Sequence, residues 1–385
     1  MPEMVHESGP RNTRWLSELP TSRPAIVIET RRHTPSSSSF SRRICPEDTA
    51  TICSMLPGPY ERWYTEMAGR ASPVEARSTC DSCVMEPGSP GLPPEGAFDP
   101  ALRCCTYHPH LAPHLVGGIL AGGSEAGRAV VRARIAAREG VTPLGLGPTP
   151  AWEATYQRVT AVPNTFGHSR DILCPFLAES RCTIWEHRGA PCAAFHCKFD
   201  RGAYGAGLWQ LIVIAFNAIE RALARWLLVR QGLEVKLCDD LLHAPGDRAL
   251  EQRAWGSWFG REEAYFVAAA ELVTPMSWAE GVAIGGRELS ELGPALRGAV
   301  TRFAAMAPPA RVQRGGDVLY RLGRSGHTVL QHSSVPFDVL EVPTPVADRL
   351  QKLQPGPLAE LVSELGLDEE LVRRLLDWQV LMPAP

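Results

Sequence analysis

Eight of the eleven cysteines lie in two short blocks, and this clustering constrains the chain more than any other feature. The first block contains Cys80, Cys83, Cys104 and Cys105, and the second contains Cys174, Cys182, Cys192 and Cys197. A Cys-x-x-Cys turn such as Cys80–Cys83 places two thiolates close together, so a soft metal can bind both at little loop-closure cost. The remaining ligands can then come from far along the chain. The sequence therefore predicts a metal centre that joins the two blocks.

The N-terminal segment indicates the cellular compartment of the protein. Residues 1–25 contain no apolar signal segment, and the Arg31-Arg32 pair is followed by serines instead of the apolar stretch that a twin-arginine signal needs. We therefore expect a cytoplasmic protein. In a reducing compartment, clustered cysteines more often bind metal than form disulfides, and an odd total of eleven also fits disulfide pairing poorly.

The length of 385 residues predicts two or three structural units, because it exceeds what one hydrophobic core usually organises. The formal net charge of -3 gives no general reason to expect nucleic acid as a partner. Residues 1–45 are rich in Ser, Pro and Arg without periodicity, so we predict a disordered leader there. We predict a cysteine-cluster domain over 46–310, with its motif core at 75–200, and a second domain over 315–385.

Hydrophobic periodicity predicts a mainly α (α+β) fold whose metal ligands lie on loops. Tyr60, Trp63, Tyr64 and Met67 recur at helical spacing and predict a helix before the first cysteine block. Between His114 and Arg138 the apolar positions predict helix, interrupted around Gly122-Gly123, with the first half lining the core.

A strongly apolar stretch, Leu208–Val229, follows the second cysteine block. It contains Glu220 and Arg221, so it lacks the roughly 18 uninterrupted apolar residues of a membrane span. We predict a buried helix and no membrane partner. The preceding glycine-rich run, Gly202–Gly207, follows no convincing strand and is predicted to be a turn.

The last seventy residues change from helical to strand patterning and back. Strands are predicted at Val318–Leu322, Thr328–His332 and Phe337–Val342, and helices at Val346–Leu353, Leu358–Leu365 and Glu369–Trp378. Gly366 is a predicted helix stop and Asp368 a predicted N-cap. Strands followed by three compact helices predict a small winged-helix-like C-terminal domain.

The second cysteine block carries a family resemblance. It reads Cys174-Pro175-Phe176-Leu177, Cys182-Thr-Ile184-Trp185-Glu186-His-Arg188 and Pro191-Cys192 with Phe195-His-Cys197. These motifs resemble those of the YkgJ-type cysteine-cluster family, a zinc- or iron-chelating domain. The resemblance covers roughly residues 75–200 and implies that the eight clustered cysteines are metal ligands.

Two departures from the family pattern concern the ligand set. A loop over 87–100 stretches the first block, and Arg188-Gly189 stands where the family usually has Arg-Pro. Adjacent Cys104 and Cys105 would point to opposite faces of a regular strand, so both can serve one centre only from an irregular turn. Otherwise one of them serves a second metal or none.

The number of cysteines is compatible with more than one metal. Four thiolates per zinc would make two closed structural sites, whereas a cubane iron-sulfur cluster would use four cysteines and leave others for a second centre. We favour iron-sulfur or mononuclear iron slightly over zinc. Cys45 lies in the predicted disordered leader, and the isolated Cys53 and Cys238 are predicted to be core or surface thiols. His108 and His196 are the first alternatives should a cysteine not bind.

The C-terminal pattern is similar to PqqD-like winged-helix domains, which bind a leader peptide in peptide-modifying enzymes. Any three-helix unit with a winged hairpin gives such leucine spacing, so a dimerisation or packing role stays open. DNA binding is less favoured, because Arg373 and Arg374 of the last helix stand among acidic residues. No P-loop, HExxH or GxSxG motif is present in the sequence.

Three functional hypotheses follow. The first is a metal-binding cysteine-cluster protein. The second is an iron-sulfur-dependent enzyme that modifies a peptide or protein presented by residues 315–385, as in peptide maturation or lysine methylation, because flagellin lysine N-methylases carry a comparable cysteine pattern. The third is a zinc-stabilised regulator of transcription.

Overall fold

The computed structural model describes residues 56–78, 102, 104–162, 167, 169–179, 181–305, 307–323, 326–336 and 338–384. The predicted leader over 1–45 and the candidate ligands Cys80 and Cys83 lie outside these residues. Within them the chain is mainly α-helical with four small antiparallel sheets, so the mainly α (α+β) class is confirmed.

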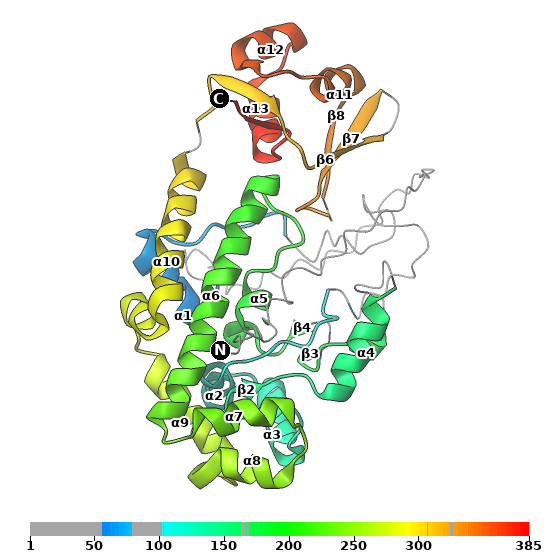
Figure 1. Ribbon diagram of the computed structural model, residues 1–385. Helices are drawn as coiled ribbons and strands as arrows, with labels where there is room; N and C mark the ends of the chain where they lie inside the picture. The colour runs from blue at the N-terminus through cyan, green and yellow to red at the C-terminus, as the bar shows by residue number, and fades with distance from the viewer. Residues whose placement is uncertain are drawn as a thin grey trace, which may run out of the picture.

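The longest helix, α6 (Gly202–Arg230), forms the axis of the helical part (Figure 1). Helix α10 (Trp278–Ala305) runs beside it and is kinked at Gly286. Helix α1 (Gly58–Ala68) buries the four aromatic and methionine side chains that predicted it, and the Tyr60 ring stacks on Phe216 of α6 at 4.8 Å. The predicted helix before the first cysteine block is therefore confirmed.

Two further helices cross at very close range. In α2 (Pro113–Gly122), a Cβ on Gly117 would lie 1.8 Å from the backbone oxygen of Phe266 in α9 (Glu262–Val273). Only glycine allows this approach. Helix α3 (Glu125–Ala137) begins after a break, where the Ser124 side chain accepts a hydrogen bond from Gly127 N. The predicted interrupted helix between His114 and Arg138 is thus confirmed.

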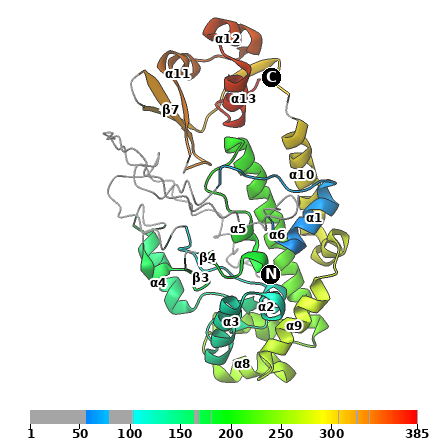
Figure 2. The same cartoon turned by 180° about the vertical axis from the view of Figure 1, so that it is seen from behind.

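The remaining helical elements of this part of the chain are shorter, and Figure 2 shows several of them from behind. They are α4 (Pro150–Thr160), η2 (Arg170–Ile172), η3 (Trp185–His187), α5 (Ala190–Ala193), α7 (Val235–His243), α8 (Arg248–Trp255) and η4 (Gly256–Trp258). Two hairpins join them: β1 (Val141–Thr142) with β2 (Gly145–Leu146), and β3 (Leu177–Ala178) with β4 (Arg181–Cys182).

Helix α6 is buried along one side, as predicted, and its apolar residues contact α1 and α10. Among the described residues, no helix combines the length and the apolar character that crossing a bilayer requires. The glycine-rich run at its start is a correction to our prediction: Gly202–Gly207 forms the first turns of α6 and is not a turn between elements. Gly202 adopts φ +49°, and a Cβ there would lie 2.7 Å from the Trp378 ring, so tertiary packing explains this glycine.

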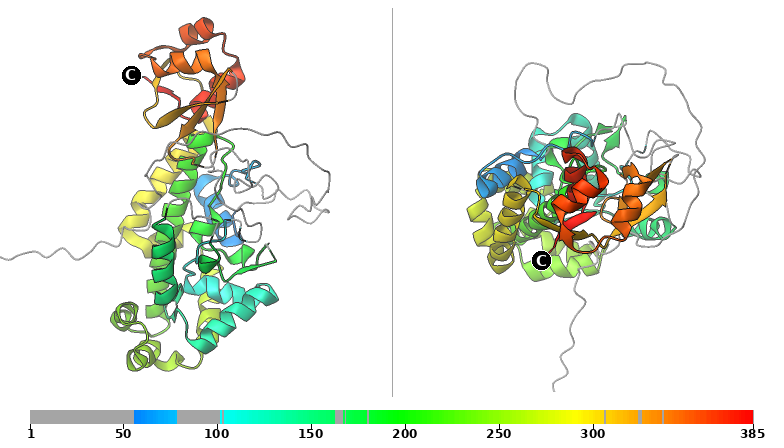
Figure 3. Two further views of the ribbon diagram at one scale, coloured as in Figure 1. Left: turned by 90° about the vertical axis from the view of Figure 1, so that its right-hand side faces the viewer. Right: turned by 90° about the horizontal axis from the view of Figure 1, so that it is seen from above.

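The C-terminal residues form two small sheets and three helices at one end of α6 and α10 (Figure 3). One sheet has the order β6-β7-β8 and the other has the order β10-β5-β9. The strands are β5 (Arg311–Arg314), β6 (Val318–Leu322), β7 (His327–His332), β8 (Leu340–Pro343), β9 (Gly356–Pro357) and β10 (Leu381–Pro383). The helices are α11 (Thr344–Gln351), α12 (Leu358–Leu365) and α13 (Glu369–Asp377).

The helix signals predicted for this region are confirmed. Gly366 ends α12 in the left-handed conformation, and the Asp368 side chain accepts the Leu371 N–H at 2.7 Å. The three predicted strands correspond to β6, β7 and β8. The sheet formed by β5, β9 and β10 was not predicted, because its strands are short and come from both ends of the region.

Buried apolar side chains form two clusters. The larger cluster is built from residues between 56 and 300, with Trp63, Phe216 and Phe266 among its largest members. The smaller one is built from residues between 312 and 381 together with Ala203 and Ala206 of α6. Helix α6 therefore contributes to both cores.

Candidate metal centre

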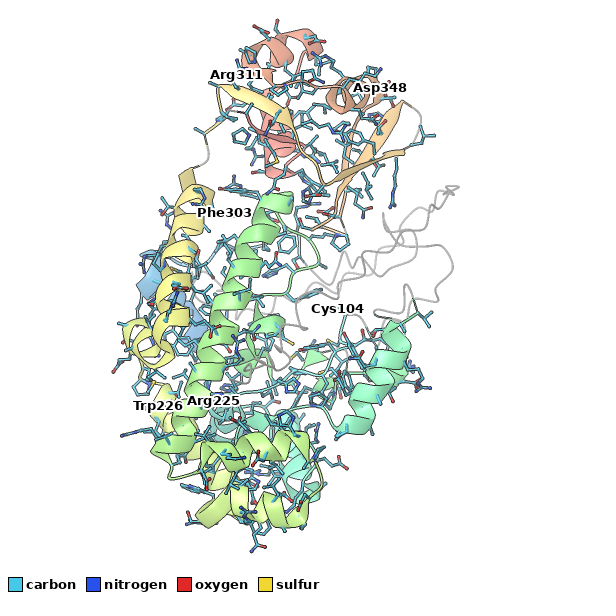
Figure 4. The ribbon with its side chains drawn as sticks, viewed as in Figure 1. Cys104, Arg225, Trp226, Phe303, Arg311 and Asp348 are labelled. Atoms are coloured by element: carbon cyan, nitrogen blue, oxygen red, sulfur yellow. The ribbon has the colours of Figure 1, made fainter. Side chains whose placement is uncertain are left out.

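The two cysteine blocks meet through the backbone. Cys174 N donates a hydrogen bond to Cys105 O at 2.8 Å, although 69 positions separate the two residues in the sequence. Cys104 lies in a turn that Cys105 N closes by donating to Leu102 O at 3.0 Å. This is the irregular geometry that adjacent cysteines need in order to face one centre. In the view of Figure 4, Cys104 lies between α6 and α4.

A small hairpin brings Cys174 and Cys182 to the same place. Cys182 ends β4 and pairs with Leu177 of β3, while Leu177 N donates back to Cys174 O at 3.1 Å. The pairing continues beyond the strands, because Thr183 N donates to Phe176 O at 2.8 Å. Both thiol-bearing residues therefore lie at the open end of the hairpin, and both side chains are partly buried against the larger core.

Cys192 is carried by the four-residue helix α5. Its N–H donates to Gly189 O at 3.0 Å. Gly189 packs tightly, since a Cβ there would lie 3.1 Å from His110 O. This contact gives a physical reason for glycine at the position where the related motif usually has proline.

Cys197 completes the second block and faces the segment that leads into the first. Its Sγ lies 3.7 Å from the Ser78 hydroxyl oxygen. Ser78 precedes Cys80 by two residues, and Cys80 and Cys83 are outside the described part of the chain. Nearby, Glu75 accepts hydrogen bonds from Trp209 Nε1 at 2.6 Å and from Asp200 N at 2.5 Å. Burial raises the pKa of Glu75 to about 7.

The thiols of the two blocks influence one another electrostatically. The pKa of Cys192 is raised to about 12, mainly by burial and in part by the neighbouring Cys182 and Cys104 thiols. Burial also raises the pKa of Cys174 to about 12, with Cys192 and Cys182 adding to the effect. The pKa of Cys197 rises by burial and by its proximity to Cys104. Without a bound cation these thiols hold their protons at neutral pH, and a metal would have to displace them.

Arg188 is a buried cation whose charge interacts with Cys182, Cys192 and Cys105. Its Nε donates to Trp185 O at 2.9 Å, its Nη1 donates to Cys192 O at 3.3 Å, and its guanidinium lies 3.4 Å from the centre of the Trp185 ring. Only 8% of the residue is exposed. Burial lowers the pKa of Arg188, while Cys182, Cys192 and Cys105 favour its charged form.

The alternative histidine ligands have different surroundings. His108 Nε2 lies 2.6 Å from Arg134 Nη1, which can only donate, so Nδ1 carries the proton and donates to Pro109 O at 2.9 Å. Both nitrogens of His108 are thereby engaged. The ring of His196 packs 4.3 Å from that of Trp209, and its buried Nε2 has no hydrogen-bond partner among the described residues.

No group of three or more His, Cys, Asp or Glu side chains within the described ranges is arranged as a metal site. These ranges contain six of the eight predicted ligands, because Cys80 and Cys83 fall outside them. The isolated Cys238 is buried in α7, where its thiol points to Ala254 O at 3.8 Å, in agreement with a core role. Cys45 and Cys53 lie outside the described residues.

Sequence reasoning missed the role of one polar residue beside the cysteines. Glu220 of α6 is buried and accepts hydrogen bonds from the Tyr60 hydroxyl and, at 2.7 Å, from Ala190 N. Burial raises the pKa of Glu220 to about 7. A signal was present, since an acidic residue in an otherwise apolar helical stretch needs a partner when it faces the core. The sequence could not show that the partner would be the turn that carries Cys192.

Comparison of the chain with protein families, with curated proteins and with solved structures finds no match.

Proposed function

We propose that this chain is a metal-binding protein whose centre takes thiolates from both cysteine blocks. The observation that carries the proposal is the hydrogen bond between Cys174 N and Cys105 O, with Cys182 and Cys192 held beside it. Adjacent, partly buried thiols from distant segments have no structural need to cluster when they form no disulfides. A soft cation would explain their proximity.

The donor chemistry fits a thiolate-bound metal. A cation such as zinc or iron that displaces three or four thiol protons leaves a centre with net negative charge. The buried Arg188 guanidinium beside Cys182 and Cys192 would offset that charge. Cys80 and Cys83 would supply further thiolates, in keeping with Ser78 lying against Cys197. We favour an iron-sulfur cluster or iron slightly over zinc, because one cubane cluster would use four cysteines and leave others for a second centre or an open coordination position, whereas zinc would make two closed sites.

The finer fold assignment belongs to the same proposal. The described cysteines lie on turns, hairpin ends and a short helix, as expected for a cysteine-rich helical domain with loop-borne ligands. The β6-β7-β8 sheet with α11, α12 and α13 is compatible with a winged-helix-like unit. A peptide or protein is the partner that we propose for this unit, in a reducing, cytoplasmic setting.

A second function, modification of a bound peptide by an iron-sulfur centre, is favoured by one contact. Arg77, three residues before Cys80, pairs with Asp338 next to β8 at 2.8 Å. This ion pair connects the approach to the first cysteine block with the C-terminal sheet. A peptide bound there would therefore lie on the same side as the candidate centre.

The test is metal retention by the full chain, purified without oxygen. We expect Cys174→Ser and Cys192→Ser to lose bound iron or zinc, because each removes a thiolate from the middle of the set. The matched control is Cys238→Ser, which alters a buried thiol of α7 far from the blocks and should retain wild-type metal content. Elemental analysis with absorption spectra gives the readout: iron with sulfide supports the cluster, and colourless protein with zinc supports structural sites. Equal metal content in all three variants would contradict the ligand assignment.

A further inference from the structure

Glu220 is a carboxyl group inside an apolar core. Its α6 neighbours Phe216, Ile219 and Leu223 are fully buried, and Glu220 itself is only 6% exposed. Burying a carboxyl costs several kcal/mol unless hydrogen bonds compensate it. Two donors do so here: the Tyr60 hydroxyl and the backbone N–H of Ala190, both to Oε1. A buried carboxyl group is expected where it holds a hydrogen-bond donor in a fixed position.

The Ala190 donor belongs to the turn that carries Cys192. Ala190 is the first residue of α5, and Gly189 O accepts both Cys192 N at 3.0 Å and Ala193 N at 2.9 Å. Gly189 lies between His110 O and the Glu220 carboxylate. A Cβ built on Gly189 would lie 3.7 Å from Glu220 Oε2. The carboxylate of Glu220 therefore holds the first N–H of the helix that presents the Cys192 thiol.

The Tyr60 donor fixes the carboxylate in turn. Tyr60 is completely buried, and its ring stacks on Phe216, one helical turn before Glu220. Helix α1 thus supplies the Tyr60 hydroxyl to the same Glu220 oxygen that accepts the Ala190 N–H of α5. The contacts run from α1 through α6 to Cys192 without involving any other cysteine.

We infer that Glu220 and Tyr60 are positioning residues, which hold the α5 turn so that Cys192 is in place before the metal arrives. The inference rests on the proposed function in one respect, namely that Cys192 is a ligand. Outer residues that orient metal ligands typically account for 10–100-fold in metal affinity. A preset ligand avoids part of the entropy cost of ordering a loop on binding.

The experiment compares Tyr60→Phe with Tyr265→Phe in the full-length chain. Tyr265 is also fully buried, and its hydroxyl donates to Pro143 O at 2.6 Å, so the control removes an equivalent hydrogen bond elsewhere in the core. Two quantities are measured: the rate at which iodoacetamide alkylates Cys192 in the metal-free protein, resolved by peptide mass spectrometry, and the affinity for Zn²⁺ in competition with a chromophoric chelator.

We expect Tyr60→Phe to speed alkylation of Cys192 and to weaken Zn²⁺ binding about 10–100-fold, while Tyr265→Phe matches the wild type in both. Glu220→Gln keeps an oxygen acceptor for Ala190 N–H, so its alkylation rate and its Zn²⁺ affinity should stay close to those of the wild type. Glu220→Leu removes the acceptor and should change both quantities more than Tyr60→Phe does. If Glu220→Leu does not fold, the comparison of Tyr60→Phe with Tyr265→Phe still tests the inference.

Alkylation is the deciding readout, because it does not require a metal. Equal Cys192 alkylation in Tyr60→Phe and Tyr265→Phe would overturn the inference. Faster alkylation in Tyr60→Phe together with a wild-type chain that binds neither Zn²⁺ nor iron would support the positioning of Cys192 and overturn the proposed function instead.

Discussion

Arg188 is a buried cation that lowers the pKa of two thiols in the proposed metal centre. The pKa values of Cys182 and Cys192 are raised by burial, and the Arg188 guanidinium lowers both. Binding of zinc by the proposed ligands would require deprotonated thiols, so the pH at which half the protein takes up zinc would depend on this cation. Removing Arg188 would raise the thiol pKa values, so zinc uptake would require a higher pH.

We therefore expect Arg188→Met to move the midpoint of Zn²⁺ uptake to higher pH. Arg188→Lys should move it less, because the charge remains while the hydrogen bonds to the Trp185 and Cys192 carbonyl groups change. Arg181→Met is the matched control, since Arg181 adjoins Cys182 in sequence but is exposed. A midpoint that is the same in Arg188→Met and Arg181→Met would show that Arg188 does not act through charge.

Residue types differ in how far their roles can be predicted from sequence. Thiol spacing grouped the cysteines into two blocks, and the hydrogen bond from Cys174 N to Cys105 O joins these blocks in the structure. Cys238 was set aside because it stands alone in the sequence, and it is buried in α7. Tyr60 was placed correctly in a buried helix face, but its hydroxyl partner was not foreseen. Glu220 and Ala190 are 30 positions apart, and a contact between helices leaves no local pattern.

At the scale of elements, the contact between α2 and α9 depends on one glycine. A methyl group on Gly117 would lie 1.8 Å from Phe266 O and 2.8 Å from the Ala270 Cβ, so the helices would have to separate. We expect Gly117→Ala to lower the free energy of unfolding by about 3 kcal/mol, as overpacking does in cores. Urea unfolding followed by circular dichroism measures the change.

Gly122, in the same helix, provides the control. A Cβ there meets nothing within 4 Å, so Gly122→Ala should be neutral or should stabilise the protein by up to about 1 kcal/mol through helix propensity. Equal destabilisation by both substitutions would mean that helix position, and not the approach of α9, determines the effect.

Elements with strong local signals were predicted well, and those defined by distant contacts were not. Both bounds of α12 follow from Leu358 and from the stop at Gly366, and α13 begins at its Asp368 cap. The Gly202–Gly207 run was predicted to be a turn because it is glycine-rich and follows no convincing strand, and glycine disfavours helix. Packing of Gly202 on Trp378, far along the chain, reverses that preference, and no local pattern contains this information.

Across the whole molecule, the end of the second cysteine block is also the junction with the C-terminal elements. Arg201, four residues after Cys197, donates from Nε and Nη2 to Asp377 Oδ1 of α13 at 2.9 and 2.8 Å. Its Nη1 donates to Phe303 O at the end of α10. One side chain thus joins the start of α6 to α10 and α13, where Phe303 and the C-terminal unit lie close together in Figure 4.

Arg201→Ala should therefore uncouple the two hydrophobic clusters. It leaves the Asp377 side chain, 3% exposed, without its cation, and breaking a buried pair in this way costs about 3 kcal/mol. We expect residues 312–384 to exchange amide hydrogens faster and to unfold at lower urea than α1 and α6, because only apolar packing, such as that of Gly202 on Trp378 and that of Ala203 and Ala206, would connect the described residues of the smaller core to α6. Arg349→Ala, which breaks an exposed pair with Glu364 inside the C-terminal unit, should leave a single transition near the wild-type midpoint. A single transition in Arg201→Ala as well would mean that apolar packing around Gly202 and Trp378 is sufficient to hold the two parts together.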